Sequence, residues 1–217
     1  MATPRLVSTG VASLEAVPRD RRDVWSLASM EGRLVEISGH RAAANLTAAF
    51  GLVLEAQRKD EPVAWVTLEK SSFFPPDAAD SGVDLKRLAV VRVSDLRAAS
   101  RATVELTRSG GFGLVVLDLG PEAFQENKGR RSRQSKKLSV PIITKLVGLA
   151  QKTATAVVAL TDKTGEASSL SSLVSLRAEA HRNPDAPSEV EIVILKDKRR
   201  GPGRRYREVY RAPAGLR

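Results

Sequence analysis

The sequence predicts an α/β protein with a mainly parallel central sheet, helices on both faces and a C-terminal antiparallel extension. From residue 33 to residue 161, β-branched apolar runs alternate with segments of helical spacing. Two of these runs, Gly113–Asp118 and Ala156–Thr161, are almost wholly apolar, which is typical of parallel strands buried on both faces. After about residue 172, the pattern changes to short runs of strict two-residue alternation between turns, which indicates antiparallel strands.

The expected elements follow one another without an internal repeat. An N-terminal entry segment, residues 1–31, leads into a single core domain at residues 32–217. Ser94 or Asp95 can cap the third helix, and Gly110-Gly111 can end it. In chain order the sequence predicts strand Arg33–Ser38, helix Ala43–Arg58, strands Val63–Leu68 and Leu88–Val93, a helix from Leu96, strand Gly113–Asp118, a helix with Pro141 in its first turn and Ile142, Leu146 and Leu149 on one side, strand Ala156–Thr161, and antiparallel strands Val174–His181, Val190–Lys196 and Arg205–Tyr210.

Composition excludes several classes of protein. The 217 residues are 42% hydrophobic, enough for one domain with a sizeable core. No run approaches the roughly 20 apolar residues of a membrane-spanning helix, and the first residues do not resemble a signal peptide. There is no cysteine, and His40 and His181 are isolated, so we expect no disulfide, no metal site, no cofactor and a cytoplasmic location.

The net charge of +10 lies entirely in the second half of the chain. Residues 1–118 carry 15 Lys/Arg and 15 Asp/Glu, whereas residues 119–217 carry 20 and 10. A basic half joined to a neutral half favours a polyanionic partner, either nucleic acid or an acidic protein. A surface that is merely rich in solvated arginine is the simpler alternative.

Two clusters hold most of this excess, and we expect both on loops. The first, KGRRSRQSKK, follows the strand that ends at Asp118, and its cations are Lys128, Arg130, Arg131, Arg133, Lys136 and Lys137. The second surrounds the expected hairpin turn Gly201-Pro202-Gly203, and its candidate binding residues are Lys196, Lys198, Arg199, Arg200, Arg204 and Arg205. Such loops bind phosphate backbones without reading sequence. Tyr206 could stack on a base, but its spacing from Tyr210 favours a packed strand residue.

The first βα turn is where an open parallel sheet binds its ligand. It reads SGHRAAANLT from Ser38 to Thr47. A phosphate-binding P-loop has the pattern G-x-x-x-x-G-K-[ST], in which the lysine neutralises phosphate and the hydroxyl holds magnesium. Only Gly39 fits, because Ala44, Asn45 and Leu46 replace the second glycine, the lysine and the hydroxyl. We therefore expect no ATP hydrolysis.

Two acidic residues stand at the ends of predicted strands. Asp118 follows an apolar strand, in the position of a magnesium-organising aspartate, and Glu69 could serve as a general base for a water molecule. Without a phosphate site, Asp118 is better interpreted as a strand-end cap. Glu69 is equally well interpreted as a surface carboxylate beside Lys70.

These features, in this order, resemble the RecA family over nearly the whole chain. The resemblance is carried by VSTGVASLE at residues 7–15, GRLVEISG at 32–39, SGVDLKRL at 81–88, LVVLD at 114–118 and SLRAEAHR at 175–182. It implies a RecA-like core in which Glu69 occupies the place of the catalytic glutamate and Asp118 that of the Walker B aspartate. It also places Asp162 where the family keeps an ATP-sensing glutamine, the first basic cluster at the first DNA-binding loop, and Lys196 and Lys198 at a lysine pair that reaches nucleotide between filament subunits.

The degraded P-loop makes the chain most similar to ImuA, the RecA-like accessory protein of the bacterial translesion mutasome. This resemblance implies an adaptor without ATPase activity that binds ImuB, a homologue of Y-family polymerases, with RecA and single-stranded DNA as further candidate partners. Two alternatives remain open at this point. One is an inhibitor of cell division like SulA, and the other is an active RecA-type DNA-dependent ATPase.

Overall fold

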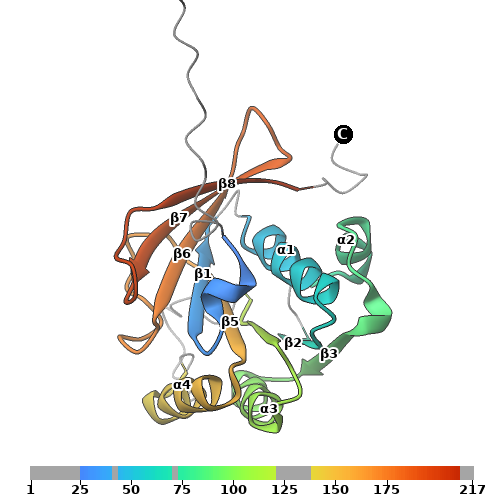
Figure 1. The fold of residues 1–217 in the computed structure, drawn as a ribbon, viewed down its shortest axis with the longest axis vertical. Helices are drawn as coiled ribbons and strands as arrows, with labels where there is room; N and C mark the ends of the chain where they lie inside the picture. The colour runs from blue at the N-terminus through green and yellow to red at the C-terminus, as the bar shows by residue number, and fades with distance from the viewer. Residues whose placement is uncertain (1–24, 41–43, 70–72, 121–137, 211–217) are drawn as a thin grey trace, which may run out of the picture.

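The computed structural model describes residues 25–40, 44–69, 73–120 and 138–210, which form one eight-stranded sheet with helices on both faces (Figure 1). The strand order is β3-β2-β4-β5-β1-β6-β7-β8. The strands are β1 (Leu34–Gly39), β2 (Val63–Leu68), β3 (Leu88–Val93), β4 (Leu114–Asp118), β5 (Ala156–Asp162), β6 (Leu176–Arg182), β7 (Glu189–Asp197) and β8 (Arg205–Val209). The helices are η1 (Leu27–Met30), α1 (Asn45–Arg58), α2 (Pro75–Asp80), η2 (Leu85–Arg87), α3 (Leu96–Ser109) and α4 (Val140–Thr153).

The predicted α/β class, mainly parallel sheet and antiparallel C-terminal extension are confirmed. β3, β2, β4, β5 and β1 pair in parallel, and β6, β7 and β8 pair antiparallel with one another. The other edge of β6 pairs in parallel with β1 along Val35–Ser38, which the sequence did not predict. Strict alternation reports that one face of a strand is buried, and it does not report the direction of the neighbouring strand.

The helices divide the apolar residues into two cores, one on each face of the sheet. α1 and α2 lie on one face, and α3 and α4 lie together on the other (Figure 1). On the α1 side, Trp65 packs against Phe50 and Phe73 with ring centroids 5.1 and 5.0 Å apart. Trp25, Leu27 and Met30, which precede the expected start of the core domain at residue 32, are buried in the same core.

The ends of α3 follow from local chemistry, as the sequence predicts. Asp95 caps α3, because its carboxylate accepts a hydrogen bond from the Ala98 amide at 2.8 Å. Gly110 ends the helix with a φ of 67°, in the left-handed region that glycine adopts without strain.

The buried stripe of α4 differs from the predicted one. Ile143, Leu146 and Ala150 are buried, while Ile142 and Leu149 are half-buried. Leu146 was therefore predicted correctly, and each of the other two buried positions lies one residue later than predicted. Among the described residues, no helix is both long and apolar enough to span a bilayer.

Candidate functional site

The carboxyl ends of β1, β2 and β4 gather the residues that the sequence marks as a degenerate nucleotide site. Gly39 ends β1, Asp118 ends β4, and Glu69 directly follows β2. Ala44 is the N-cap of α1, and Asn45 and Leu46 are the first residues of that helix. The parallel sheet thus brings these residues to one edge, although they are up to 79 positions apart in the sequence (118 − 39).

The start of α1 is closed by contacts within the chain. Ala44 is 1% exposed, and its amide donates to the carbonyl of Ala180 in β6 at 3.2 Å. The Asn45 side chain folds back so that its Oδ1 accepts from the Leu46 amide at 2.9 Å. Free amides at a helix N-terminus bind anions. Here two amides that would face a phosphate already have partners in the protein.

Asp118 is held by the protein in the same way. It is 2% exposed, its Oδ2 accepts from the Thr67 hydroxyl at 2.9 Å, and its Oδ1 accepts from the Gly120 amide at 3.1 Å. These contacts suit a carboxylate that joins β4 to β2 and shapes the turn that follows. Glu69 is exposed, and its backbone amide bonds to the carbonyl of Val93.

The structure adds residues to this edge that the sequence analysis did not assign. Arg182, the last residue of β6, donates to the Thr47 hydroxyl in the first turn of α1 at 2.9 Å. The imidazole Nδ1 of His40 lies 3.0 Å from Asp162 Oδ1 in an exposed pair. No sequence signal could have found the contact between Arg182 and Thr47, because its two residues are 135 positions apart.

A buried glutamate fixes the segment between β5 and β6 beside the same edge. Glu36 in β1 is fully buried, and its Oε1 lies 2.5 Å from Lys163 Nζ. Its Oε2 accepts hydrogen bonds from the Ser169 hydroxyl and the Leu170 amide at 2.9 and 2.8 Å. A buried carboxylate needs such compensation. The network ties the β5–β6 segment to the sheet and engages the charge of Lys163 within the chain.

The second basic cluster lies at the opposite end of the sheet from the degenerate nucleotide site. Asp197, the last residue of β7, bonds to Arg33 at the start of β1, with 2.6 Å between Oδ1 and the Arg33 Nη2. The turn between β7 and β8 follows directly, with Gly201 at φ 78° and Gly203 at φ 96°. The predicted hairpin is confirmed, and it projects from the amino end of the parallel strands.

Asp197 divides the cations of the hairpin into anchored and exposed ones. Its side chain is 1% exposed, and its Oδ2 lies 2.5 Å from Arg204 Nη2. Burial alone would raise the pKa of Asp197, but the hydrogen bonds from the Arg199 amide and the Arg33 guanidinium outweigh it and lower the pKa. For the cation Lys196, by contrast, burial lowers the pKa. Its Nζ donates a hydrogen bond to the Ser172 carbonyl at 3.0 Å.

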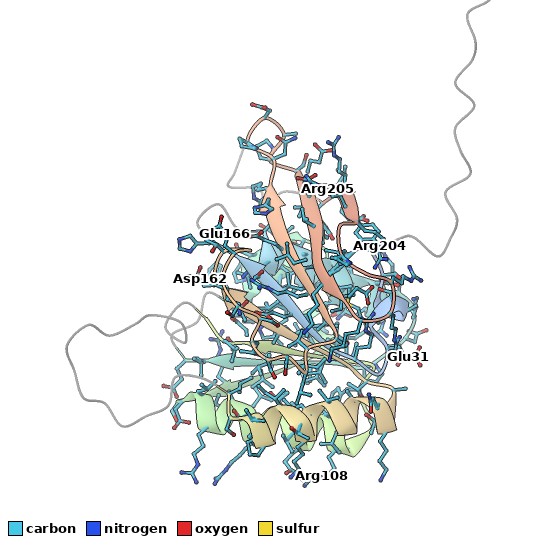
Figure 2. The ribbon with its side chains drawn as sticks, turned by 90° about the vertical axis from the view of Figure 1, so that its left-hand side faces the viewer. Glu31, Arg108, Asp162, Glu166, Arg204 and Arg205 are labelled. Atoms are coloured by element: carbon cyan, nitrogen blue, oxygen red, sulfur yellow. The ribbon has the colours of Figure 1, made fainter. Side chains whose placement is uncertain are left out.

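The remaining cations of the hairpin point to solvent. Lys198, Arg199, Arg200 and Arg205 are exposed, and Figure 2 labels Arg205, the first residue of β8, together with Arg204. Tyr206 is half-buried and packs near Trp25, with ring centroids 6.2 Å apart, as the interpretation of a packed residue predicts. The first basic cluster, residues 128–137, lies outside the described residues. In the described ranges, no group of three or more acidic or histidine side chains forms a candidate metal site.

The chain is similar to RecA proteins over part of its length. It is 34% identical to RecA of Thermotoga petrophila over 87 residues, which cover 40% of this chain and 24% of that protein. It is 30% identical to RecA of Clostridium acetobutylicum over 118 residues, which cover 52% of this chain and 30% of that protein. The matches thus span about a quarter to a third of the RecA proteins. No protein-family model matches the chain.

The architecture is similar to that of a solved recombinase. The crystal structure of the RadB recombinase superposes with a TM-score of 0.61 over 84% of this chain and 92% of that one, at 19% identity. The parallel sheet, the helices on both faces and the antiparallel C-terminal strands are therefore those of the RecA-like fold. The chain therefore combines a RecA-like fold with a sequence similarity to RecA proteins over part of its length.

Proposed function

We propose that this protein is a RecA-like accessory factor without ATPase activity that works as an adaptor in damage-induced translesion DNA synthesis in the cytoplasm. Its principal partner would be a homologue of Y-family polymerases of the ImuB type, with RecA and single-stranded DNA as further partners. The observation that carries the proposal is the start of α1. The RecA-like fold is kept, but Ala44, Asn45 and Leu46 stand where a P-loop has glycine, lysine and a hydroxyl.

The geometry of that turn supports the loss of ATPase activity. A P-loop lysine neutralises a highly anionic ligand, and asparagine supplies no charge. The Asn45 amide oxygen also caps the Leu46 amide, which removes a donor that a phosphate would need. Replacing Asn45 by lysine and Leu46 by threonine should not restore turnover, because the buried Ala44 is bonded through its amide to β6.

Nucleotide assays with the purified protein test this part directly. We expect no magnesium-dependent ATP hydrolysis and no tight binding of ATP, with or without single-stranded DNA. Turnover that Asp118→Ala abolishes would contradict the proposal and favour an active RecA-type ATPase.

Binding to a purified ImuB-type protein tests the adaptor role. We expect micromolar or tighter association, weakened at least tenfold when Lys198, Arg199, Arg200 and Arg205 are all changed to glutamate. Arg204 is kept, because it binds the buried Asp197. The matched control reverses four exposed cations of α3 and α4, namely Arg97, Arg101, Lys145 and Lys152. Association with the tubulin-like division protein instead would favour an inhibitor of cell division.

DNA binding is a separate part of the proposal and needs its own measurement. Cationic loops that contact phosphates bind with a steep salt dependence and little sequence preference. Changing Arg130, Arg131 and Arg133 to alanine should reduce the salt slope by roughly two to three phosphate contacts. An unchanged slope would remove the first basic cluster from the DNA site.

A further inference from the structure

The edge strand β8 presents half of its backbone groups to the outside of the sheet. Among the described strands, β8 is the last of the sheet and pairs only with β7. The Ile194 amide donates to the Arg204 carbonyl and the Tyr210 amide to the Ser188 carbonyl, both at 2.8 Å. Hydrogen-bonded positions alternate in an antiparallel ladder. The amides and carbonyls of Arg205, Arg207 and Val209 therefore point away from β7.

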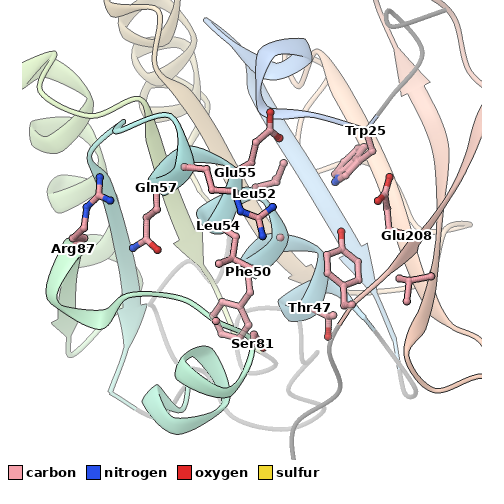
Figure 3. A pocket seen from close by; sticks show the side chains of 15 residues that line it. Trp25, Thr47, Phe50, Leu52, Leu54, Glu55, Gln57, Ser81, Arg87 and Glu208 are labelled. Atoms are coloured by element: carbon pink, nitrogen blue, oxygen red, sulfur yellow. The ribbon is translucent and has the colours of Figure 1, made fainter. Parts of the chain in front are cut away.

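A groove of about 760 Å³ lies beside this edge (Figure 3). One wall is the end of β8, residues 208–210, and the opposite wall is formed by Ser81, Gly82 and Arg87. The floor is the outer face of α1, where Thr47, Gly51 and Leu54 carry no charge, while Glu55 and Arg58 line the groove further along the helix. Figure 3 shows Trp25 and Glu208 at one side of the groove and Arg87 at the other. The groove has the position that the next strand of the sheet would occupy above α1.

Glycine at position 51 gives the groove its shape. A Cβ on Gly51 would overlap with the ring of Tyr210, so the helix can hold this aromatic side chain only because residue 51 has none. Glycine in the middle of a helix is less favourable than alanine, so its presence here calls for a packing reason. Tyr210, directly after β8, is thereby fixed against α1 and forms part of the groove wall.

On the face of β8 that points away from α1, most of the charged side chains are basic. Arg205, Arg207 and Val209 are exposed there, with Val209 77% exposed. Glu191 of β7 partly compensates Arg205 at 3.4 Å, and the exposed Lys198, Arg199 and Arg200 lie at the adjoining turn. Long, flat edges are usually protected in monomeric proteins. β8 has basic residues but no proline in Arg205–Val209, and no strand of the described residues pairs with its outer edge.

We propose that the β8 edge and the adjoining groove bind an extended segment of a partner protein, which adds to the sheet as a strand and alternates acidic with apolar residues. Main-chain bonds to Arg205, Arg207 and Val209 would give affinity, as in other cases of strand addition. Successive side chains of a strand point to opposite faces. The acidic set would meet Arg205 and Arg207, and the apolar set would enter the groove over Gly51 and Leu54. The inference does not depend on a role in translesion synthesis, since it requires only a partner with such a segment.

A fluorescent nine-residue peptide of alternating valine and glutamate is the probe. It should bind the full chain with a dissociation constant in the micromolar range. A peptide with lysine in place of glutamate should bind at least tenfold more weakly. The same glutamate peptide with alternate backbone nitrogens methylated should lose binding, because it cannot complete a ladder.

Val209 offers variants that leave the ladder between β7 and β8 intact. Val209→Pro removes one outward amide, and proline is tolerated at such edge positions. Val209→Glu instead adds a repulsive charge. Each should weaken probe binding at least tenfold with no change in melting temperature beyond about 2 °C. The matched control is Val140→Glu at the start of α4, another exposed valine, 66% exposed and on the opposite face of the sheet. It should bind like the unmodified protein.

Several outcomes would overturn the inference. They are no binding of the glutamate peptide at millimolar concentration, equal binding of the lysine peptide, or undiminished binding by Val209→Pro. Leu54→Lys, which places a charge on the groove floor, is a second variant should proline disturb the fold, and its undiminished binding would also count against the groove. A chain that sediments as a dimer and becomes monomeric with Val209→Pro would assign the edge to a second copy of the protein instead.

Discussion

The first βα turn and the β7–β8 hairpin lie at opposite ends of the sheet, and they use polar groups in opposite ways. At the turn, Asn45 caps a helix amide and Asp118 accepts from Thr67, so polar groups that resemble a nucleotide site are bonded within the chain. At the hairpin, one buried carboxylate, Asp197, binds Arg33 and Arg204, and the other cations reach solvent. The comparison shows that a residue's role cannot be inferred from its match to a motif position alone. The hydrogen-bond partners of that residue in the folded chain are also needed.

The largest expected effect is at the hairpin anchor. Asp197→Ala leaves Arg33 buried at 4% exposure without its carboxylate partner. Removing one member of a buried ion pair typically costs about 3–5 kcal/mol. Urea denaturation should show a loss of this size, while Lys198→Ala at the exposed turn should stay within about 0.5 kcal/mol. A loss below about 1 kcal/mol for Asp197→Ala would mean that the hairpin does not depend on this anchor.

At the other end of the sheet, Asp118→Ala should cost about 2–3 kcal/mol. The carboxylate bonds to the Thr67 hydroxyl and the Gly120 amide. Hydrogen bonds to charged groups contribute about 1.5–3 kcal/mol each, and the cost of burying the carboxylate offsets part of this sum. The exposed Glu69 is the matched control, and Glu69→Ala should change the free energy of unfolding by less than about 0.5 kcal/mol. If Asp118→Ala stabilised the protein, the carboxylate would be held at a cost in stability, as metal-binding carboxylates are.

The contact between Gly51 and Tyr210 gives a smaller effect whose sign can be reversed. Gly51→Ala should destabilise the protein by about 1–2 kcal/mol, because the added methyl group overlaps with the Tyr210 ring. In a Tyr210→Ala background the same change should stabilise it by about 0.5–1 kcal/mol through helix propensity. A double-mutant cycle in urea measures both values. Additive effects would show that the tyrosine does not lie on the helix.

The smallest effect expected is a dependence on alkaline pH. Burial, and next the carboxylates of Glu208 and Glu55, raise the pKa of the Tyr210 phenol above its ordinary value. The unfolded chain therefore releases this proton first as pH rises. The contribution of Tyr210 is fully present below about pH 10 and is lost above it. Unfolding curves for Tyr210→Phe should decline less between pH 9.5 and 11, by roughly 1 kcal/mol, than those of the unmodified protein, and identical slopes would contradict the assignment.

The sequence by itself determined most of the secondary structure. Strands Val63–Leu68 and Leu88–Val93 have the predicted bounds, and Asp95 and Gly110 delimit α3 as expected. These features depend on hydrophobic periodicity and on backbone preferences of single residues, which are local properties. The difference between residues 38–47 and the P-loop pattern is also visible in the sequence, because that motif is contiguous in the chain.

The tertiary structure alone decided the parallel pairing of β6 with β1, the partners of the charged residues and the groove over α1. The alternation in β6 reports that one face is buried, which holds for a parallel strand as much as for an antiparallel one. Arg33 and Asp197 are 164 positions apart, and nothing in either neighbourhood marks them as a pair. In the sequence, Gly51 is only an unfavourable residue within a helix, and the structure shows that the Tyr210 ring packs against it. Such contacts arise only when distant segments pack together, because burial and proximity are properties of the folded chain.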